Sequence, residues 1–423
     1  MRDKEIYLFK HILLILILSI GLNANTIYQS VKYALDNSDK LKSQNIDIEI
    51  QDRYIAQAKS ANYPTVDLNL YKKREKTEFQ NRDDSINSST NYSITLKQNI
   101  YNGGYDKNKI KMAQKDREIA MLEYQKLTQE VIYGAIEAHI NLIETQKLLN
   151  IYKNMISKYK SFQYMANQKV KYGNEIDKLE VDIKLENAIL RYLDLQNTYQ
   201  RQEEIYREKV GISPYKLNNY IKIKKYLVKD ISKINFNKIN KDLLNNAINI
   251  EKSNYLIAQS NANFLPKIDI TLKAYKSEPL VQTDVITDNQ YSGEINIRYN
   301  LFNGGRDKIT KEINRLKKLK LIINHQDILK AIKQKYYKNF LQFKYSQKYT
   351  YKIKRYIKNS LKKYNKYNKL FKLSSQKSIL DMTGVIADIA SAKEKLAKNR
   401  TTIIMSYINI LLLQSKLTPK VLK

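Results

Sequence analysis

The sequence predicts a mainly α-helical fold with a smaller β-structured part, internally duplicated, with four long helical segments and four strands per chain. Three observations predict this fold. Two nearly identical glycine-containing segments lie 201 residues apart, alternating apolar and polar residues precede each of them, and long segments almost free of glycine and proline follow each of them. A duplicated order of two strands and then two long helices accounts for all three.

The duplication is visible when the chain is aligned with itself. "IYNGG" at 100–104 matches "LFNGG" at 301–305, and Pro64 aligns with Pro266 at an offset of 202. The offset of 201 continues downstream, where Glu180 aligns with Asp381. The sequence therefore predicts repeat 1 over 25–220, a linker over 221–245, repeat 2 over 246–415 and a C-terminal tail over 416–423.

The first residues have the pattern of a secretory signal peptide. Arg2, Lys4 and Lys10 precede the apolar run "ILLILILSIG" at 12–21. The run is shorter than the roughly 20 residues that span a bilayer, although a membrane anchor is the alternative. We expect a signal peptide over 1–24, and hence an exported mature chain.

The strands are predicted by a period of two. In repeat 2, Ile268, Ile270, Leu272 and Ala274 alternate with polar residues, and repeat 1 repeats the pattern at Val66, Leu68, Leu70, Ile94, Leu96 and Ile100. Polar connections make each pair a hairpin. The predicted strands span about 65–77, 90–101, 267–276 and 291–302, which are lengths that suit a tilted bilayer-spanning strand.

After each glycine segment the apolar period becomes helical. Gly134 is the only glycine or proline between 105 and 172, and neither residue type occurs between 306 and 383. The predicted helices span about 105–170, 175–209, 306–372 and 378–414, and the longest of them would be rods of roughly 100 Å.

The glycine segments are predicted to be the joints between strand and helix. A chain that changes from strand to helix without a loop needs backbone conformations that are open chiefly to glycine, and asparagine tolerates positive φ and caps helices. The alternative is an ordinary helix-starting turn away from any membrane. The predicted joint residues are Asn102, Gly103, Gly104, Asn303, Gly304 and Gly305.

Four strands do not close a membrane barrel, because spanning barrels need about eight or more strands and an open edge leaves unpaired backbone in lipid. We therefore expect an oligomer, with eight strands from two copies or twelve from three. The alternative is an exported coiled-coil scaffold protein without a pore, whose strands form a soluble sheet. A lipid-facing strand position tolerates leucine but not lysine, which distinguishes the two.

Composition argues against several other classes of protein. The formal net charge of +33 would suit a nucleic-acid partner, but export opposes this and the lysines are spread along helical faces. No catalytic or nucleotide-binding motif occurs, so we expect no enzymatic activity, no cofactor and no metal site. The chain has no cysteine, which excludes lipidation at an N-terminal cysteine.

These features together resemble the TolC-like outer membrane efflux protein family of Gram-negative bacteria. The resemblance rests on the duplicated plan, the proline before each first strand, the segment from Gln98 to Gly104 with its counterpart at 299–305, and the "SILD" motif at 378–381. It implies a homotrimer, with twelve strands in an outer membrane barrel above a periplasmic helical tunnel. It further implies a passive exit duct for efflux or type I secretion that serves a periplasmic adaptor and an inner membrane transporter.

The resemblance also implies a periplasmic aperture at the turns between the long helices. The acidic role there falls on Asp381 and Glu180, and Lys377 stands where a linking arginine can stand. Gly384 occupies the next acidic position of the family, so a second acidic ring is not expected. The alternative for both carboxylates is helix capping. The remaining residues of the predicted turns are Tyr172, Gly173 and Ser378. The cargo, the identity of the adaptor and the face on which the basic residues lie are not predicted.

Overall fold

The computed structural model describes residues 26–78, 80, 85–170, 175–218, 221, 223–224, 230–279, 289–373 and 378–422. The predicted signal peptide lies outside these residues. The described chain is mostly helical and contains one small antiparallel sheet. Within the described residues, no helix is both long enough and apolar enough to cross a membrane.

The chain forms two compact units that do not coincide with the two sequence repeats. Unit 1 contains Met1–Leu41, Gln125–Asn240 and Lys330–Lys423, and unit 2 contains Lys42–Tyr124 and Lys241–Leu329. Each unit therefore combines one part of repeat 1 with the equivalent part of repeat 2. This is the expected result when long helices from both repeats pass through both units.

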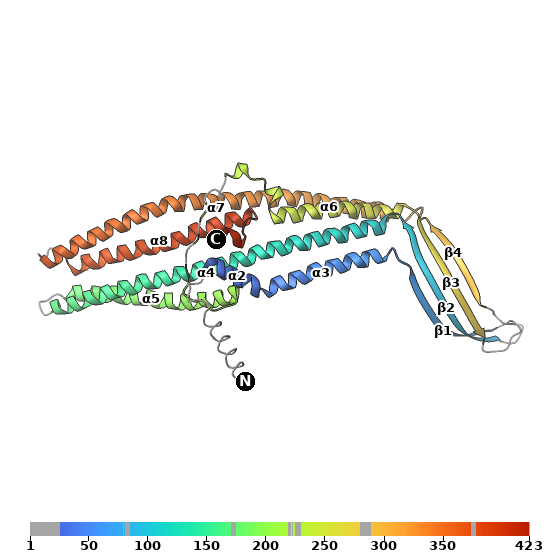
Figure 1. Ribbon diagram of the computed structural model, residues 1–423, viewed down its shortest axis with the longest axis horizontal. Coiled ribbons are helices and arrows are strands. Elements are labelled where there is room, and N and C mark those ends of the chain that lie inside the picture. The colour runs from blue at the N-terminus through green and yellow to red at the C-terminus, as the bar shows by residue number, and fades with distance from the viewer. Residues whose placement is uncertain are drawn as a thin grey trace, which may run out of the picture. The chain divides into compact units, whose positions relative to one another are not determined.

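Unit 2 contains the sheet and the helices that lead to it. Helix α3 (Asp39–Ser60) precedes β1 (Thr65–Thr77) and β2 (Ser85–Asn102), while α6 (Lys241–Asn261) and a short 3-10 helix, η4 (Ala262–Phe264), precede β3 (Lys267–Pro279) and β4 (Gln290–Arg298). All neighbouring strands are antiparallel, in the order β1-β2-β3-β4 (Figure 1). The two hairpins of the repeats thus lie side by side in a single sheet.

Three strand ends differ from the sequence prediction, including that of β3, which ends at Pro279 and not near 276. β2 begins at Ser85 and not near residue 90, because Ser85–Ser89 pair with the far end of β1. β4 ends at Arg298 and not at 302, because Arg298 already pairs with Lys267, the first residue of β3. Alternation along one strand does not reveal where its partner strand begins or ends.

A β-bulge changes the alternation near the end of β2. Asn99 pairs with Asp269 and Tyr101 pairs with Ile268, so Ile100 has no partner in this register. The bulge places Tyr101, and not Ile100, opposite the apolar residue Ile268. The period of two, which predicted Ile100 on the apolar face, cannot anticipate an inserted residue.

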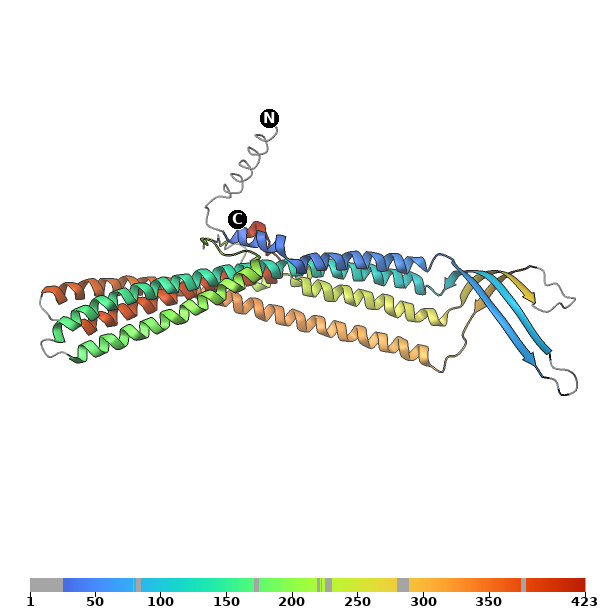
Figure 2. The ribbon, with the colours of Figure 1, turned by 90° about the horizontal axis from the view of Figure 1, so that it is seen from below.

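Unit 1 is built around four long helices. These are the later part of α4 (Tyr105–Val170), α5 (Glu175–Val210), the later part of α7 (Arg306–Leu373) and α8 (Ile379–Leu413), which run side by side (Figures 1 and 2). With 66 and 68 residues, α4 and α7 are each rods of roughly 100 Å. The absence of proline and near absence of glycine allow this length, since either residue in a helix interior is destabilising.

Shorter elements complete unit 1. Helix α2 (Ile27–Asn37) begins with a capping box formed by Thr26 and Gln29. The chain between α5 and α6 contains two short 3-10 helices, η2 (Ile231–Lys233) and η3 (Phe236–Lys238), and η5 (Pro419–Leu422) lies near the C-terminus. Phe236 of η3 is buried against Tyr336 of α7, with ring centroids 5.5 Å apart. This contact holds η3 against α7.

A buried hydrogen-bond chain joins α2, α4 and α5 in unit 1. The Nε2–H of His139 donates to the carbonyl oxygen of Asn218, so Nδ1 is the acceptor for the hydroxyl of Ser30, at 2.8 Å. The hydroxyl of Tyr206 lies 2.8 Å from the same serine oxygen. Burial lowers the pKa of His139 to about 4, although the bond to Asn218 opposes this shift. His139 is therefore neutral near pH 7.

Candidate functional site

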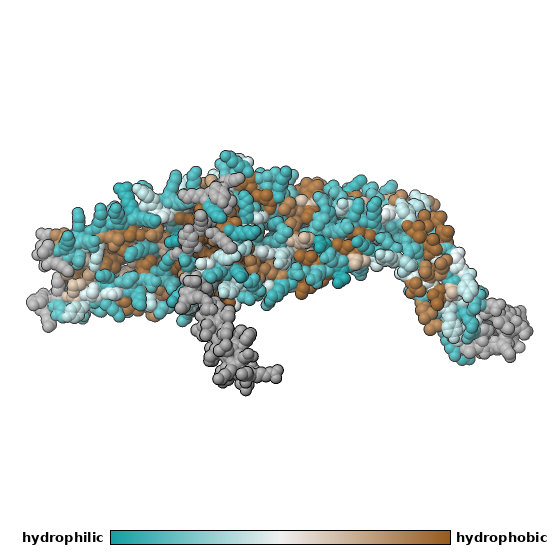
Figure 3. Space-filling model, in the orientation of Figure 1, coloured by the Kyte–Doolittle hydropathy of each residue, from teal (hydrophilic) through white to brown (hydrophobic). Residues whose placement is uncertain are grey.

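One face of the sheet is apolar and open to the surroundings. Paired rows cross the strands, for example Leu68–Ile94–Ala274–Tyr291, so the alternation of each strand places its apolar residues on the same face. Leu68 is 65% exposed and Ile295 is 71% exposed. Figure 3 shows hydrophobic residues gathered on the strands. A contiguous exposed apolar surface of this kind marks a contact with another protein or with a membrane.

The height of this apolar face matches a bilayer. On β2 it extends from Tyr101 to Tyr92, which is ten residues by number. At about 3.3 Å per residue and a tilt of about 45°, this length corresponds to roughly 23 Å, close to the apolar band of an outer membrane strand. Aromatic residues lie near both limits, with Tyr92 and Tyr291 toward the hairpin ends and Tyr101 and Tyr299 toward the helices.

The opposite face of the sheet is polar. Asn91 and Ser93 of β2 are buried there, and the hydroxyl of Tyr275 on β3 donates to the Asn91 side chain. Lys97 lies 3.9 Å from Asp269 on the neighbouring strand, which partly neutralises the charge of this face. One apolar and one polar face per strand is the pattern of a sheet with lipid on one side and water on the other.

The first glycine pair lies directly between a strand and a helix. Asn102 is the last residue of β2 and Tyr105 is the first residue of α4, while Gly103 and Gly104 have φ of 67° and 79°. Asn102 donates from Nδ2 to the carboxylate of Asp106 and accepts from the Asp106 backbone N–H. The pair therefore turns the backbone, and the asparagine holds the first turn of the helix.

The second glycine pair has the same backbone conformation in more open surroundings. Gly304 and Gly305 have φ of 55° and 78° and precede Arg306, the first residue of α7. The backbone N–H of Arg306 donates to the carbonyl oxygen of Asn303 at 3.0 Å. A Cβ at Gly304 would meet nothing within 4 Å, whereas one at Gly103 would lie 2.8 Å from the Ala262 backbone. The two joints therefore differ in how closely they are packed.

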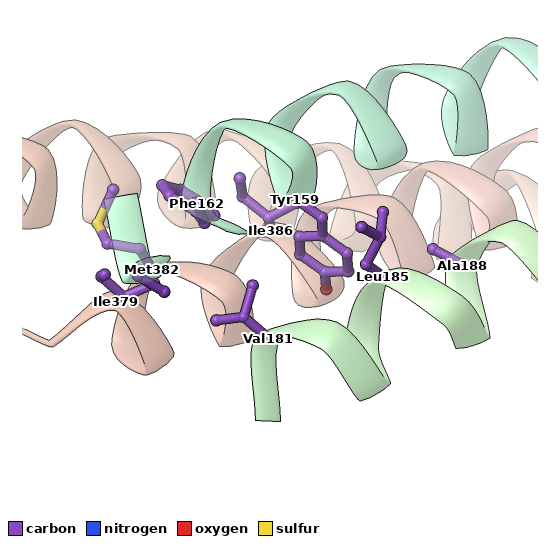
Figure 4. Close-up of a cluster of buried hydrophobic side chains, with 9 residues drawn as sticks. Tyr159, Phe162, Val181, Leu185, Ala188, Ile379, Met382 and Ile386 are labelled. Carbon is purple, nitrogen blue, oxygen red and sulfur yellow. The ribbon is translucent and has the colours of Figure 1, made fainter. Parts of the chain in front are cut away.

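The ends of the long helices in unit 1 are held by an apolar cluster. It is formed by α4, α5 and α8, so it joins both repeats (Figure 4). Its buried members are Tyr159, Phe162, Ala166, Val181, Leu185, Ala188, Ile379, Met382 and Ile386. The cluster fixes the ends of the helices near the predicted aperture.

The two predicted acidic residues have different environments. Asp381 belongs to a capping box: its carboxylate accepts from the Ser378 backbone N–H at 3.0 Å, and its own backbone N–H donates to the Ser378 hydroxyl at 3.1 Å. Glu180 is exposed, lies beyond the first turn of α5, and is 4.0 Å from Lys184. Lys377, Tyr172 and Gly173 lie outside the described residues.

Direct polar contacts join the same three helices beside this cluster. Thr383 of α8 accepts two hydrogen bonds from other helices. The hydroxyl of Tyr159 on α4 donates to its carbonyl oxygen at 3.2 Å, and the ammonium of Lys184 on α5 donates to its hydroxyl at 3.1 Å. Gln163 of α4 donates to Asp182 of α5 at 2.8 Å. Three of the long helices are thus connected near their ends.

Glu394 of α8 is the centre of a second set of contacts. Tyr152 of α4 donates to one carboxylate oxygen at 2.9 Å, and Lys398 and Arg191 lie 2.7 Å and 3.5 Å from the other. Burial alone raises the pKa of this carboxyl, but the hydrogen bonds from Lys398 and Tyr152 outweigh burial and lower the pKa below its ordinary value. A carboxylate is therefore retained between the helices at neutral pH.

These linking residues are not predicted by the sequence. Tyr152 lies on an apolar helical stripe, where an aromatic residue is ordinarily part of a core, and Glu394 lies in a segment rich in charged residues. Their pairing joins positions 242 residues apart. No local pattern indicates such a pair, although a tyrosine on a packing seam often keeps a hydrogen-bond partner for its hydroxyl.

Part of the chain is similar to a known protein family. The family model described as outer membrane efflux protein matches residues 31–207. The match lies within the predicted repeat 1. No curated protein matches the chain significantly by sequence.

Solved outer membrane channels share the fold over nearly the whole chain. The Campylobacter jejuni CmeC outer membrane channel is 15% identical, with a TM-score of 0.81 over 92% of this chain and 85% of that chain. The outer membrane protein VceC from Vibrio cholerae is 11% identical, with a TM-score of 0.78 over 92% and 96%. The open state of the Neisseria gonorrhoeae MtrE outer membrane channel is 13% identical, with a TM-score of 0.78 over 93% and 90%. The likeness therefore shows that the fold of these channels is shared by both repeats.

Proposed function

We propose that this protein is an outer membrane channel that forms the exit duct of an efflux or type I secretion system. In this proposal the sheet of unit 2 lies in the outer membrane, and the long helices enclose a passage through the periplasm. The observation that carries the proposal is the sheet itself, because one face is apolar and exposed over a bilayer-sized height while the other is polar.

The edges of the sheet support an oligomer. β1 and β4 are the outer strands of the sheet, and within the described residues neither has a second neighbour. Unpaired strand edges in lipid are costly, so β1 of one copy is expected to pair with β4 of the next. Three copies of four strands give a closed barrel of twelve strands, which is an even number within the range of bacterial outer membrane barrels. We propose a homotrimer on this basis.

The helices of unit 1 support the same assembly. Helix α5 exposes Ile176, Leu179, Ile183, Leu190 and Leu193, which are spaced by three, four, seven and three residues, as on a coiled-coil seam. Helix α7 exposes Tyr345, Tyr349 and Tyr356, which are spaced by four and seven residues. Ile176 is 72% exposed in a single chain, so such a seam needs a partner helix. We propose that α5 of one copy packs against α7 of its neighbour.

Gating is proposed to occur at the ends of the long helices. Glu180, Asp381 and Lys377 are the proposed aperture residues, and the contacts centred on Thr383 and Glu394 would hold α4, α5 and α8 in one arrangement. A periplasmic adaptor would open the passage by separating these helices. The duct would be passive, with energy supplied by an inner membrane transporter. The similar MtrE channel of Neisseria gonorrhoeae was solved in an open state, which is consistent with a gated fold.

The proposal is tested by placing a charge on each face of one strand. Leu68 lies on the apolar face of β1, and the adjacent Asn69 lies on the polar face. A lysine on the lipid-facing side of a barrel costs about 2 to 4 kcal/mol at the midplane and less toward the interfaces, so Leu68→Lys is expected to reduce the amount of assembled channel in outer membrane fractions. Asn69→Lys is the matched control and is expected to assemble normally. Equal assembly of both variants would favour the exported coiled-coil scaffold without a pore.

A further inference from the structure

The apolar face of the sheet continues into a basic patch at the end away from the helices. On β1, Val66, Leu68 and Leu70 are followed on the same face by Lys72, Arg74 and Lys76, because residues two apart share a face. On β3, Lys276 pairs with Tyr92 of β2, which in turn pairs with Leu70. The boundary of the apolar face is therefore also the beginning of a cluster of cations, formed by Lys72, Arg74, Lys76 and Lys276.

Cations on the two faces of β1 differ in their partners. Lys73, on the polar face, forms an ion pair with Glu75 at 2.6 Å. Lys72 and Arg74 are exposed and have no ion-pair partner among the described residues. Lys76 and Lys276 are paired with Glu78 and Glu278, each at 2.6 Å. The unneutralised positive charge of this strand thus lies on the face that continues the apolar surface.

We infer that Lys72 and Arg74 form a binding site for the phosphate of a membrane lipid headgroup. The inference rests on the proposed function, which places the apolar face in the lipid. A headgroup is the occupant that this position favours, because acyl chains would contact Leu68 and Leu70 while the phosphate lies one or two residue pairs further along the strand. Arginine binds phosphate through two parallel N–H donors, and a lysine beside it adds a flexible point charge.

The spacing on the sheet fits such a ligand. Lys72 and Arg74 are two residues apart on one strand, so their Cα atoms lie roughly 7 Å apart. Their side chains carry the charge to the boundary of the apolar band, as long basic side chains do beside lipid. Tyr92 on the neighbouring strand supplies an aromatic ring at the same boundary. A headgroup at this site would contact an apolar row, an aromatic ring and two cations at once.

The test measures lipid binding to the whole detergent-extracted protein by native mass spectrometry. Diphosphoryl lipid A is the probe, phosphatidylethanolamine is the zwitterionic comparison, and inorganic phosphate is the competitor. The test variant is Lys72→Gln with Arg74→Gln. The control variant is Lys73→Gln with Lys97→Gln, which removes the same charge from the polar face.

The inference predicts that wild type and the polar-face control bind diphosphoryl lipid A equally, and that the test variant binds it at least roughly tenfold more weakly. This follows because each basic residue near an anionic surface contributes about a factor of five. Inorganic phosphate at equal concentration should not displace the lipid. Equal binding by all three proteins, or displacement by inorganic phosphate, would overturn the inference while leaving the channel intact. A wild-type protein that is monomeric, or that is not recovered from the membrane fraction, would overturn the proposed function as well. The mass measured before lipid is added shows whether the protein is a monomer.

Discussion

The hydroxyl of Tyr152 on α4 donates a hydrogen bond to the carboxylate of Glu394 on α8 at 2.9 Å, which joins repeat 1 to repeat 2. Lys398 and Arg191 contact the same carboxylate, so this one side chain contacts three helices including its own. The contact lies among the long helices of unit 1, and in the proposed channel the separation of these helices would widen the passage.

Replacing Glu394 is expected to weaken this connection. Glu394→Gln removes the charge that Lys398 and Arg191 contact, and hydrogen bonds to charged groups contribute about 1.5 to 3 kcal/mol when they are well buried. Because Lys398 and Arg191 are partly exposed, we expect a loss of about 1 kcal/mol in stability and a higher conductance in planar bilayers. Asp388→Asn, at an exposed acid on the same helix, is the control and should change neither. Unchanged conductance in Glu394→Gln would remove this residue from gating.

The glycines at the two joints are expected to tolerate alanine differently. Both Gly103 and Gly304 have positive φ, so alanine costs about 1 to 2 kcal/mol at each. Gly103→Ala would in addition bring Cβ within 2.8 Å of the Ala262 backbone, whereas Gly304→Ala meets nothing within 4 Å. Thermal unfolding in detergent should therefore show a larger loss for Gly103→Ala. An equal loss at both positions would mean that close packing at the first joint contributes nothing.

Replacing Asp381 and replacing Glu180 are expected to reduce the stability of the protein by different amounts, even if both residues line the aperture. Asp381→Ala removes a capping box, which costs about 1 kcal/mol, whereas Glu180→Ala removes one exposed contact to Lys184 and should cost little. The proposed aperture predicts that the double variant has a raised conductance in planar bilayers. A loss of stability with wild-type conductance would instead assign Asp381 to helix capping alone.

The lowered pKa of His139 predicts that the protein becomes less stable in mild acid. Its pKa is about 4 in the folded protein and near 6.5 in an unfolded chain, so between these values the unfolded chain binds more protons. The contribution of His139 to the free energy of unfolding is therefore fully present above pH 6.5 and is lost as the pH falls toward 4. The loss is at most about 3 kcal/mol. Thermal unfolding of His139→Gln should depend less on pH over this range than that of wild type. The same slope in both would contradict the assignment.

The lowered pKa of Glu394 predicts a separate loss of stability at lower pH. Its folded pKa lies below the ordinary value of 4.5, so its contribution is present above that value and is lost as the pH falls through the lowered pKa. Between pH 5 and 7 it should not contribute to the slope. Thermal unfolding of Glu394→Gln and of wild type, compared below and above pH 4.5, separates the effect of Glu394 from that of His139. A difference in stability that is confined to pH 5 to 7 would be inconsistent with a lowered pKa.

Periodicity predicted much of this fold, because strands and helices of a duplicated chain repeat their apolar spacing. It did not predict the start of β2 at Ser85, since Ser85–Ser89 have a loop-like composition and become strand only by pairing with β1. It also did not predict the bulge at Ile100, or the end of β4 at Arg298, because both depend on the register with β3. Local sequence determines the type of an element, and its ends depend on its partners.

The candidate site was less predictable than the fold. The spacing of Ser378 and Asp381 is a capping-box pattern that is visible in the local sequence. Glu394, Thr383 and His139 make their contacts over long sequence separations, so nothing near them in the chain indicates their partners. Their roles follow only when the helices of both repeats are packed together.

The native mass of the protein extracted in detergent from a purified outer membrane fraction tests the central proposal most directly. A closed barrel built from the four strands of each chain, with β1 and β4 paired between copies, predicts a mass of three chains. A monomer, or recovery of the protein from the soluble periplasmic fraction, would contradict the channel.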